Sequence, residues 1–259
     1  MKYHIDTIPV WDAVKQDCEC FLCALETRTE QQEAERFLGA SVMEPDIRIQ
    51  VNRQGFCRNH HRMLFGMGNR LGHALMLESH TAESIRTVSA CLNDIKKAAG
   101  AASGSILSKY GRSGQAVKKS YEEAVGRLAD AAGGCILCEA VHTYMQRCCE
   151  TVLLLWENDS EFRRQFSGTK GLCLCHLADL LRLAPQVLSS RLVPEFADAV
   201  EKLEKPNLDR IQEDISWFIK KFDYRYEAEP WKNSQNAVQR TCNKLRGACL
   251  PEDQASSGR

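Results

Sequence analysis

The amino-acid sequence predicts an all-α protein, and three observations support this. Apolar residues recur at helical spacing along most of the chain. Alternation typical of a strand is scarce, and its best example is the short run IRIQV at 47–51. Glycine and proline residues separate the periodic stretches, as they do between helices. We therefore expect helices joined by short turns.

The expected helices follow one another with breakers between them. They cover residues 8–17, 21–38, 58–67, 70–98, 115–131, 136–157, 174–183, 187–204, 207–222 and 235–247. The breakers are Gly39, Pro45, Gly68, the stretches at 100–105 and 133–134, Gly168, Gly171, Pro185, Pro206 and Pro230. Proline belongs in this set because it has no N–H to donate within a helix.

A stretch rich in glycine, alanine and serine at 99–114 is the most linker-like part of the chain. It separates an N-terminal helical half at 1–98 from a C-terminal half at 115–230. A last helix and a flexible tail follow at 231–259. We expect two pseudo-repeated halves, each held by its own metal site, with the last helix covering the join.

The two halves resemble each other beyond their cysteines. CECFLCALE at 18–26 aligns with GGCILCEAV at 133–141. DIRIQVNRQGFCRNH at 46–60 aligns with EFRRQFSGTKGLCLCH at 161–176, with one inserted residue. The first and third cysteines lie 37 positions apart in one half and 38 in the other. We interpret this as an internal repeat that covers about 16–98 and 131–223.

Each half contains a C-x2-C motif followed, about 34 residues later, by a C-x2-H motif. Two intervening residues let both side chains reach one ion, and three thiolates with one imidazole make a closed tetrahedral zinc site. Gly55 and Gly171 supply the backbone freedom that each turn before the third cysteine needs. The expected cofactor is two zinc ions per chain. The first site is expected to contain Cys20, Cys23, Cys57 and His60, and the second Cys135, Cys138, Cys173 and His176.

Other interpretations of these residues stay open. The same donors can hold an iron–sulfur cluster, which is usually all-cysteine but accepts histidine. The paired thiols can also act as redox dithiols, or be small buried residues repeated by duplication. Cys18 and Cys175 are spare thiols without equivalents in the repeat, and we expect neither to be a ligand. Cys148 and Cys149 are expected to be buried as small hydrophobic residues.

Residues beside the motifs are assigned structural roles. His60 rather than His61 is the expected ligand, because leucine follows the equivalent His176. Arg48 and Arg163 match in the repeat, and we expect them to hydrogen-bond the loops that present the third cysteine. The aromatic and acidic segment FDYRYEAEPW at 222–231 is expected to be a packed connector, with an interaction site as the alternative.

Five stretches of the chain are similar to an uncharacterised bacterial family, a domain of unknown function found mainly in anaerobic Gram-positive lineages. They are MKYHIDTIPVWDA, DCECFLCALE, ERFLGASVMEPDIRIQVNRQGFC, NRLGHALMLESH and FDYRYEAEPW. The resemblance extends over nearly the whole chain and implies no established activity. An anaerobic habitat favours an oxygen-sensitive cluster more than the composition alone does.

Composition narrows the function further. No apolar run approaches the roughly 20 residues of a membrane span, and no signal-peptide core is present, so we expect a cytoplasmic protein. In that compartment the 13 cysteines favour metal ligation or thiol chemistry over disulfides. The 34 basic and 34 acidic residues balance, which argues against a nucleic-acid partner.

No phosphate-binding loop, zinc-protease motif or nucleophile elbow is present. We therefore expect a metal-binding helical scaffold or protein-interaction module without catalytic activity, whose protein partner is unknown. The alternatives are an iron–sulfur or thiol-based redox or sensor protein and, with least support, an enzyme with an exchangeable metal ligand.

Overall fold

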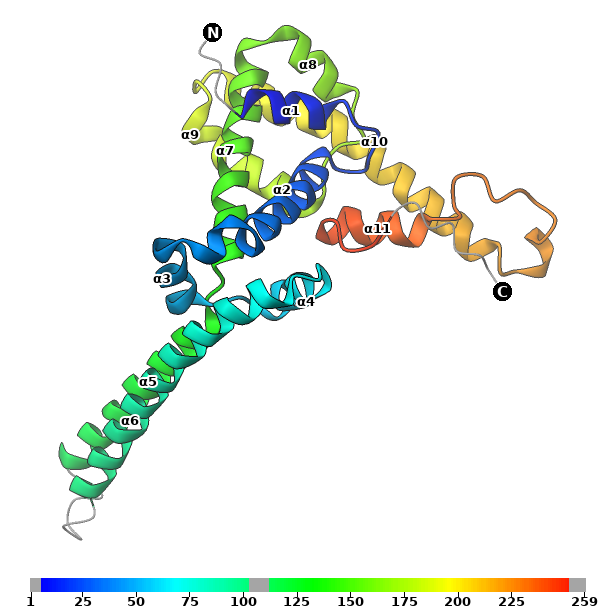
Figure 1. Cartoon of the computed structure of the whole chain (residues 1–259). Coiled ribbons are helices and arrows are strands. Elements are labelled where there is room, and N and C mark those ends of the chain that lie inside the picture. The colour runs from blue at the N-terminus through cyan, green and yellow to red at the C-terminus, as the bar shows by residue number, and fades with distance from the viewer. Residues whose placement is uncertain (1–5, 103–111, 252–259) are drawn as a thin grey trace. The chain divides into compact units, whose positions relative to one another are not determined.

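The structure is a computed structural model that describes residues 6–102 and 112–251. Within these ranges it contains α-helices and short 3-10 helices but no strand, so the predicted all-α class is confirmed (Figure 1). The helices are α1 (Thr7–Val14), α2 (Phe21–Leu38), η1 (Ala40–Met43), α3 (Pro45–Gln54), α4 (Arg58–Gly66), α5 (Arg70–Ala102), α6 (Arg112–Gly133), α7 (Ile136–Asn158), α8 (Ser160–Ser167), α9 (Leu174–Val187), α10 (Leu192–Lys220), η3 (Tyr224–Tyr226) and α11 (Ala237–Arg246). None of the described helices is both long and apolar enough to cross a bilayer.

Two of the described α-helices were not expected from the sequence. α3 contains the IRIQV run, and it begins with Pro45 at a position where a missing N–H costs nothing. α8 begins after Asp159, whose carboxylate accepts hydrogen bonds from the N–H groups of Glu161 and Phe162. Both helices are short, which explains why periodicity alone did not reveal them.

The prediction that Pro185 and Pro206 end helices is wrong. Pro185 lies in the last turn of α9, and Pro206 lies within α10, which joins the segments predicted at 187–204 and 207–222. Beside Pro206, the Asn207 amide donates a 2.9 Å hydrogen bond to the carbonyl four residues earlier. This bond adds a donor at the turn where proline has none.

Helix covers both ends of the predicted linker at 99–114. α5 continues to Ala102, and α6 begins at Arg112. The intervening residues 103–111 lie outside the described residues, as do residues 252–259 at the end of the predicted helix and tail at 231–259.

The chain divides into two compact units. One contains residues 1–29 and 143–259, and the other contains residues 30–142. This division differs from the predicted halves at 1–98 and 115–230, because the first 29 residues belong with the C-terminal part of the chain.

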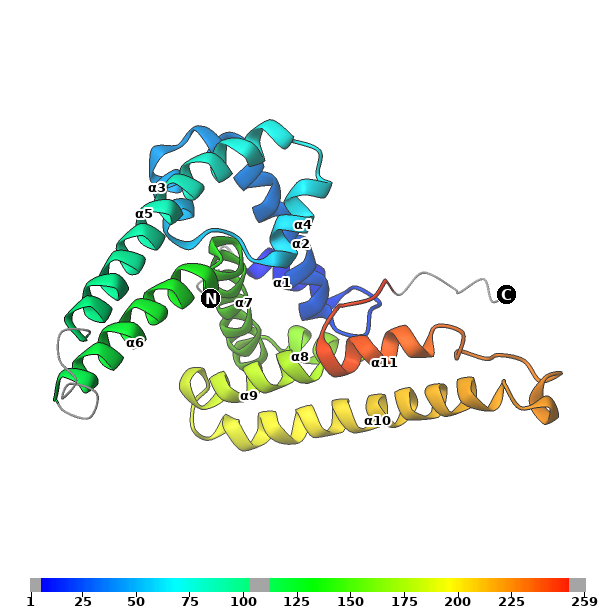
Figure 2. The same ribbon diagram turned by 90° about the horizontal axis from the view of Figure 1, so that it is seen from below.

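The first unit is packed around phenylalanine side chains. The Phe166 ring of α8 lies 6.1 Å from the Phe21 ring of α2 and 6.3 Å from the Phe196 ring of α10, measured between centroids. All three side chains are fully buried. In the same unit α11 lies alongside α10 (Figure 2). This core fixes the N-terminus of α2 relative to α8 and α10.

The second unit has a smaller core and a long helical hairpin. The rings of Phe37 and Phe56 meet edge to face with centroids 5.8 Å apart. Beyond this core, α5 and α6 run antiparallel and side by side (Figures 1 and 2). Among the side chains that the structure describes here, those fully buried between the two helices are small, such as Cys91 and Ala124.

Candidate metal centres

Two groups of cysteine and histidine side chains converge, one in each unit. Within each group the four candidate ligand atoms all lie within 4.8 Å of one another. We call the group in the first unit cluster one; it contains Cys20, Cys23, Cys173 and His176. Cluster two lies in the second unit and contains Cys57, His60, Cys135 and Cys138.

The structure brings together the eight residues singled out in the sequence but pairs their motifs differently. The predicted combination of each C-x2-C motif with the next C-x2-H motif is wrong. Cluster one joins the first C-x2-C motif to the last C-x2-H motif, and cluster two joins the two inner motifs. The two sites are therefore nested along the chain. Each compact unit closes around one of them, which is why the units do not follow the sequence halves.

Cluster one is buried throughout. The Nδ1 atom of His176 lies 3.6 Å from the sulfur of Cys20 and 3.4 Å from that of Cys23. It lies 3.4 Å from the sulfur of Cys173, which is itself 3.5 Å from the Cys23 sulfur. Burial of all four side chains shields this site from solvent.

Cluster two has the same internal geometry but is more exposed. The Nδ1 atom of His60 lies 3.3 Å from the sulfurs of Cys57 and Cys138, and 3.1 Å from that of Cys135. The sulfurs of Cys57 and Cys138 are 3.8 Å apart. Cys138 is exposed and Cys57 and Cys135 are half-buried, so solvent reaches one side of this cluster.

Both clusters lie at the N-termini of helices. The C-x2-C motifs open α2 and α7, whereas Cys57 and Cys173 directly precede α4 and α9. The backbone N–H of Cys23 lies 3.4 Å from the Cys20 sulfur, and Cys138 repeats this contact with Cys135. N–H groups and the positive ends of helix dipoles stabilise thiolates, so two helix N-termini offset negative charge at each cluster.

A glycine with positive φ lies two residues before the cysteine of each C-x2-H motif and shapes the turn that presents it. Gly55 has φ 63° and Gly171 has φ 81°, a region that other residues rarely adopt. A Cβ atom on Gly171 would lie 2.7 Å from the Glu204 carboxylate, which accepts a 2.6 Å bond from the Leu172 N–H. A Cβ atom on Gly55 would lie 2.6 Å from the His80 ring. Close packing and conformation thus both require glycine at these turns.

Each cluster histidine has a carboxylate behind it, a feature that the sequence analysis missed. Nε2 of His60 lies 2.8 Å from an oxygen of Glu30, and Nε2 of His176 lies 3.6 Å from an oxygen of Glu26. Metal-binding histidines usually contact a carboxylate or carbonyl through the nitrogen that faces away from the metal. The two glutamates are four residues apart on α2. The sequence alone does not assign either of them to a histidine, because that assignment depends on how the motifs pair.

The donors also perturb one another's protonation. Hydrogen bonding to Cys135 and Glu30 raises the pKa of His60 to about 10. Burial acts to raise the pKa of Cys135, but hydrogen bonds from His60 and the Cys138 backbone outweigh it and bring that pKa to about 6. In Cys138, burial and the neighbouring Cys135 sulfur raise the pKa instead. Because metal binding needs deprotonated donors, it would release protons from this cluster.

A family model described as a family of unknown function (DUF6062) matches residues 1–252. The chain belongs to this family. A search of the curated proteins and a search of the solved structures each found no match. Membership of DUF6062 therefore supplies no activity, and the clusters are the main evidence for function.

The remaining cysteines of this DUF6062 protein belong to neither cluster. Cys18 is half-buried and Cys175 is exposed, and neither belongs to either group of four. Cys148 and Cys149 are buried, as expected of small hydrophobic residues, and burial raises their pKa values to about 11 and about 12. Among the alternative ligands, His61 pairs with His73, with 3.1 Å between Nδ1 and Nε2.

The expected role of the two repeat-matched arginines is wrong. Arg48 donates a 3.1 Å hydrogen bond to the Leu75 carbonyl on α5, not to the loop before Cys57. Arg163 donates to the Glu157 carbonyl at 3.2 Å and pairs with Glu195 at 2.8 Å. Both guanidinium groups thus connect helices. The turns that present Cys57 and Cys173 are shaped by Gly55 and Gly171 instead.

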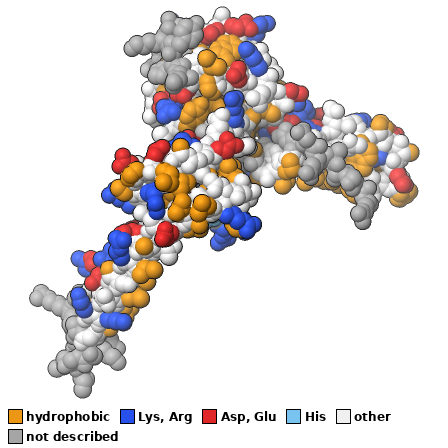
Figure 3. Space-filling model, in the orientation of Figure 1, with side chains coloured by type: hydrophobic (Ala, Val, Ile, Leu, Met, Phe, Trp, Pro, Cys, Tyr) orange, Lys and Arg blue, Asp and Glu red, His pale blue; other side chains and the backbone are white. Residues whose placement is uncertain are grey.

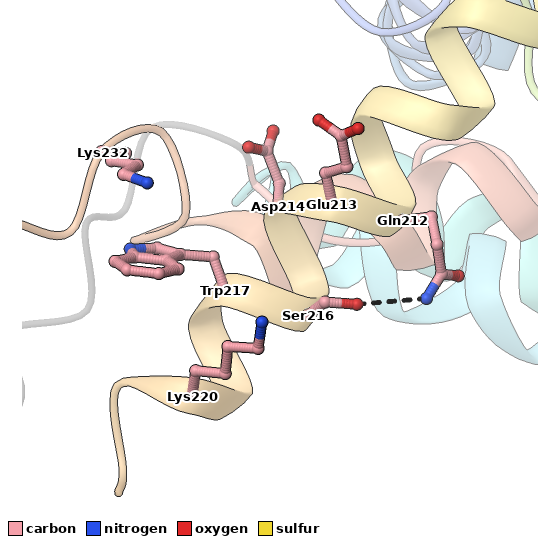
Figure 4. A pocket seen from close by; sticks show the side chains of 7 residues that line it. All are labelled: Gln212, Glu213, Asp214, Ser216, Trp217, Lys220 and Lys232. Carbon is pink, nitrogen blue, oxygen red and sulfur yellow. Dashed lines mark hydrogen bonds between the residues drawn. The ribbon is translucent and has the colours of Figure 1, made fainter. Parts of the chain in front are cut away.

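A pocket of about 340 Å³ lies beside the C-terminal part of α10 (Figure 4). Its walls carry charges of both signs, and the Lys232 ammonium lies 3.8 Å from the centre of the Trp217 ring. The Asp214 carboxylate pairs with Arg240 at 2.9 Å. The nearby segment at 222–231 is a partly packed connector. Its Trp231 ring contacts the rings of Phe218 on α10 and of Phe222, which follows the end of that helix. Within this segment Asp223 and Arg225 form an ion pair at 2.6 Å.

Proposed function

We propose that this protein is a non-catalytic helical scaffold stabilised by two structural zinc ions, one in each cluster, that presents helices to a protein partner. The observation that carries the proposal is the spacing of the donors. Around a tetrahedral zinc ion, thiolate sulfurs lie about 3.8 Å apart, and a sulfur and an imidazole nitrogen lie about 3.5 Å apart.

The donor distances of both clusters fit this geometry. Sulfur–nitrogen separations run from 3.1 to 3.6 Å. The sulfur–sulfur separations are 3.5 Å in cluster one and 3.8 Å in cluster two. The carboxylates behind both histidines add the outer contacts that orient ligands in zinc sites.

The same spacing favours a single ion over an iron–sulfur cluster. A four-iron cluster binds each protein ligand through a different iron atom, so its ligands stand apart around a cage of iron and sulfide. The four donors here approach within 4.8 Å of one another, which leaves room between them for one ion. A Cys3His set also fills all four positions of zinc, as in structural sites, whereas catalytic sites keep one position open.

Metal binding in these positions would stabilise the fold by closing long stretches of chain. The Cys23 and Cys173 sulfurs are 150 residues apart in sequence, and His60 and Cys135 are 75 apart. A site that does not exist in the unfolded chain contributes its binding free energy to folding. Each ion would therefore hold one compact unit together.

Metal content and absorbance test the proposal. Protein purified without oxygen is expected to be colourless and to contain two zinc ions per chain by elemental analysis. A brown preparation containing iron and sulfide would instead identify an iron–sulfur protein.

A variant that removes one ligand from each cluster tests the structural role. Cys20→Ser with Cys135→Ser is expected to lower zinc content and melting temperature, whereas Cys175→Ser, at an exposed thiol outside the clusters, should change neither. Native helicity and an unchanged melting temperature in the double variant would contradict the scaffold proposal.

A further inference from the structure

The hairpin of α5 and α6 exposes a row of large apolar side chains. On α5 the row contains Ile85, Val88 and Leu92, and on α6 it contains Tyr121 and Val125. Ile85 is 60% exposed, Leu92 is 47% exposed and Val125 is 55% exposed. Figure 3 shows hydrophobic side chains gathered along one edge of this hairpin. Such a patch on an exposed helical layer indicates an interaction surface.

These side chains lie on one face of the hairpin. With about 100° of rotation per residue, Ile85, Val88 and Leu92 all lie to the same side of the buried Cys91. Tyr121 and Val125 lie to the corresponding side of the buried Ala124, and the antiparallel direction of α6 turns them towards the same face. We call this the apolar face.

The opposite face of the hairpin is charged. There Asp94 of α5 and Arg127 of α6 form an ion pair at 2.6 Å. The pair spans the two helices, which fixes the face on which both residues lie. The apolar face is therefore not a consequence of general hydrophobicity, because the hairpin is amphipathic as a unit.

The apolar face does not serve to join α5 to α6. The fully buried residues between the helices are small, as Cys91 and Ala124 show. The larger side chains instead follow the spacing 85, 88, 92 and 95 on α5, which is the i, i+3, i+7, i+10 pattern of a helix packing against another helix. The hairpin therefore has the pattern of half a four-helix bundle.

The charges at the border of the apolar face differ between the two ends of the hairpin. Lys96 and Lys118 lie near the tip, where Lys118 pairs with Glu122 at 3.7 Å, so the tip keeps a net positive charge. Glu78 lies near the base on α5, and all four residues are exposed. Two copies packed face to face and antiparallel would place each basic tip beside the acidic base of the other. This charge pattern is complementary to itself under a two-fold axis.

We propose that the apolar face binds the same face of a second copy of this chain, so that two hairpins form an antiparallel four-helix bundle. The proposal makes the partner of the scaffold another copy. It rests on the proposed function only in naming the partner of the scaffold, because neither metal cluster contributes a residue to the apolar face.

Sedimentation velocity of the full chain over a wide concentration range tests the proposal. We expect a monomer–dimer equilibrium in which Leu92→Glu raises the dissociation constant by at least about tenfold, since it places a charge in the apolar contact. Ala90→Glu is the matched control, because Ala90 is exposed on the charged face of the same helix. It should leave the dissociation constant unchanged. A monomer at every concentration, or a dimer that Leu92→Glu does not weaken, would overturn the proposal.

A charge exchange tests the antiparallel arrangement. Lys96→Glu should weaken the dimer, because the introduced carboxylate lies beside Glu78 of the second copy. Adding Glu78→Lys should restore the dimer. A dimer that the exchange does not restore overturns this arrangement. Zinc content and helicity are measured for every variant. If both are unchanged while association fails, the hairpin proposal falls and the zinc proposal does not.

Discussion

An oxygen of Glu30 lies 2.8 Å from Nε2 of His60, while Nδ1 of the same ring faces three cysteine sulfurs. The carboxylate therefore orients the imidazole and fixes which nitrogen is directed at the sulfurs. His60 is buried, whereas Glu30 is partly exposed, so the glutamate can be replaced without opening a cavity in the core.

Replacing Glu30 should weaken metal binding at cluster two alone. We expect Glu30→Gln to reduce zinc affinity there by about 10–100-fold, because the histidine loses its outer carboxylate. Competition with a chromophoric chelator measures the affinity. Glu35→Gln, at an exposed position on the same helix, is the control. Equal affinities in the two variants would show that Glu30 does not support the ligand.

Double variants can test the nested pairing directly. Cys20→Ser with Cys173→Ser removes two ligands of cluster one, so the protein should retain about one zinc ion per chain. Cys20→Ser with Cys57→Ser removes one ligand from each cluster and should lower the content at both. Elemental analysis of the zinc content distinguishes the two double variants. If Cys20→Ser with Cys57→Ser instead keeps one full site, the pairing of successive motifs would be correct.

The two clusters should differ in their loss of metal to a chelator. Every ligand of cluster one is buried, whereas Cys138 in cluster two is exposed. We expect release in two kinetic phases, with cluster two as the fast phase, because solvent and chelator reach its ion without prior unfolding. Stopped-flow chelation of the wild type and of Cys20→Ser with Cys173→Ser assigns the phases. The fast phase should survive in the variant, and its disappearance would reverse the assignment.

Gly171→Ala should destabilise the first unit. The backbone at Gly171 has φ 81°, and the added Cβ atom would lie 2.7 Å from the Glu204 carboxylate. We expect a loss of about 1–3 kcal/mol in the free energy of unfolding, measured with urea. Gly168→Ala is the control, since that residue has φ −91° and no neighbour closer than 3.5 Å to the added atom. A similar loss in both variants would point to helix α8 rather than to the turn.

His73 should contribute to loss of stability in acid. Burial lowers its pKa in the folded protein, so the unfolded chain binds the proton more readily. Stability from this group is present above the unfolded pKa of about 6.5 and is lost as pH falls towards the lower folded value. We expect the decrease in unfolding free energy between about pH 7.5 and about pH 5.5 to be smaller in His73→Gln than in the wild type. Equal decreases in urea unfolding at saturating zinc would exclude this contribution.

The helical class and most helix positions could be predicted from the sequence because long amphipathic stretches are strongly periodic. The predicted span 21–38 of α2 matches the observed helix. The short helix α3 escaped notice, since IRIQV also alternates like a strand, and tertiary packing rather than local pattern decides such runs. The interior position of Pro206 was missed because the helix is long enough to continue across one missing hydrogen bond.

The pairing of the motifs could not be predicted from the sequence. Both possible pairings give three cysteines and one histidine per site, so ligand chemistry does not distinguish them. Loop length does not decide either, because the entropy cost of closing a loop grows only slowly with its length. Burial of Phe21 and Phe166 in one core helps to position Cys20 beside Cys173, and such long-range packing has no local signature. Glu26 and Glu30 were missed for the same reason.

The nested order of the ligands has a consequence for synthesis on the ribosome. All ligands of cluster two have emerged once Cys138 leaves the exit tunnel, so the inner site can close on a partial chain. Cys20 and Cys23 are the first ligands to emerge, yet they must wait for His176 before their site is complete. The earliest ligand thiols of the nascent chain thus wait longest for their site, and they stay open to oxidation or to a wrong ligand for most of translation.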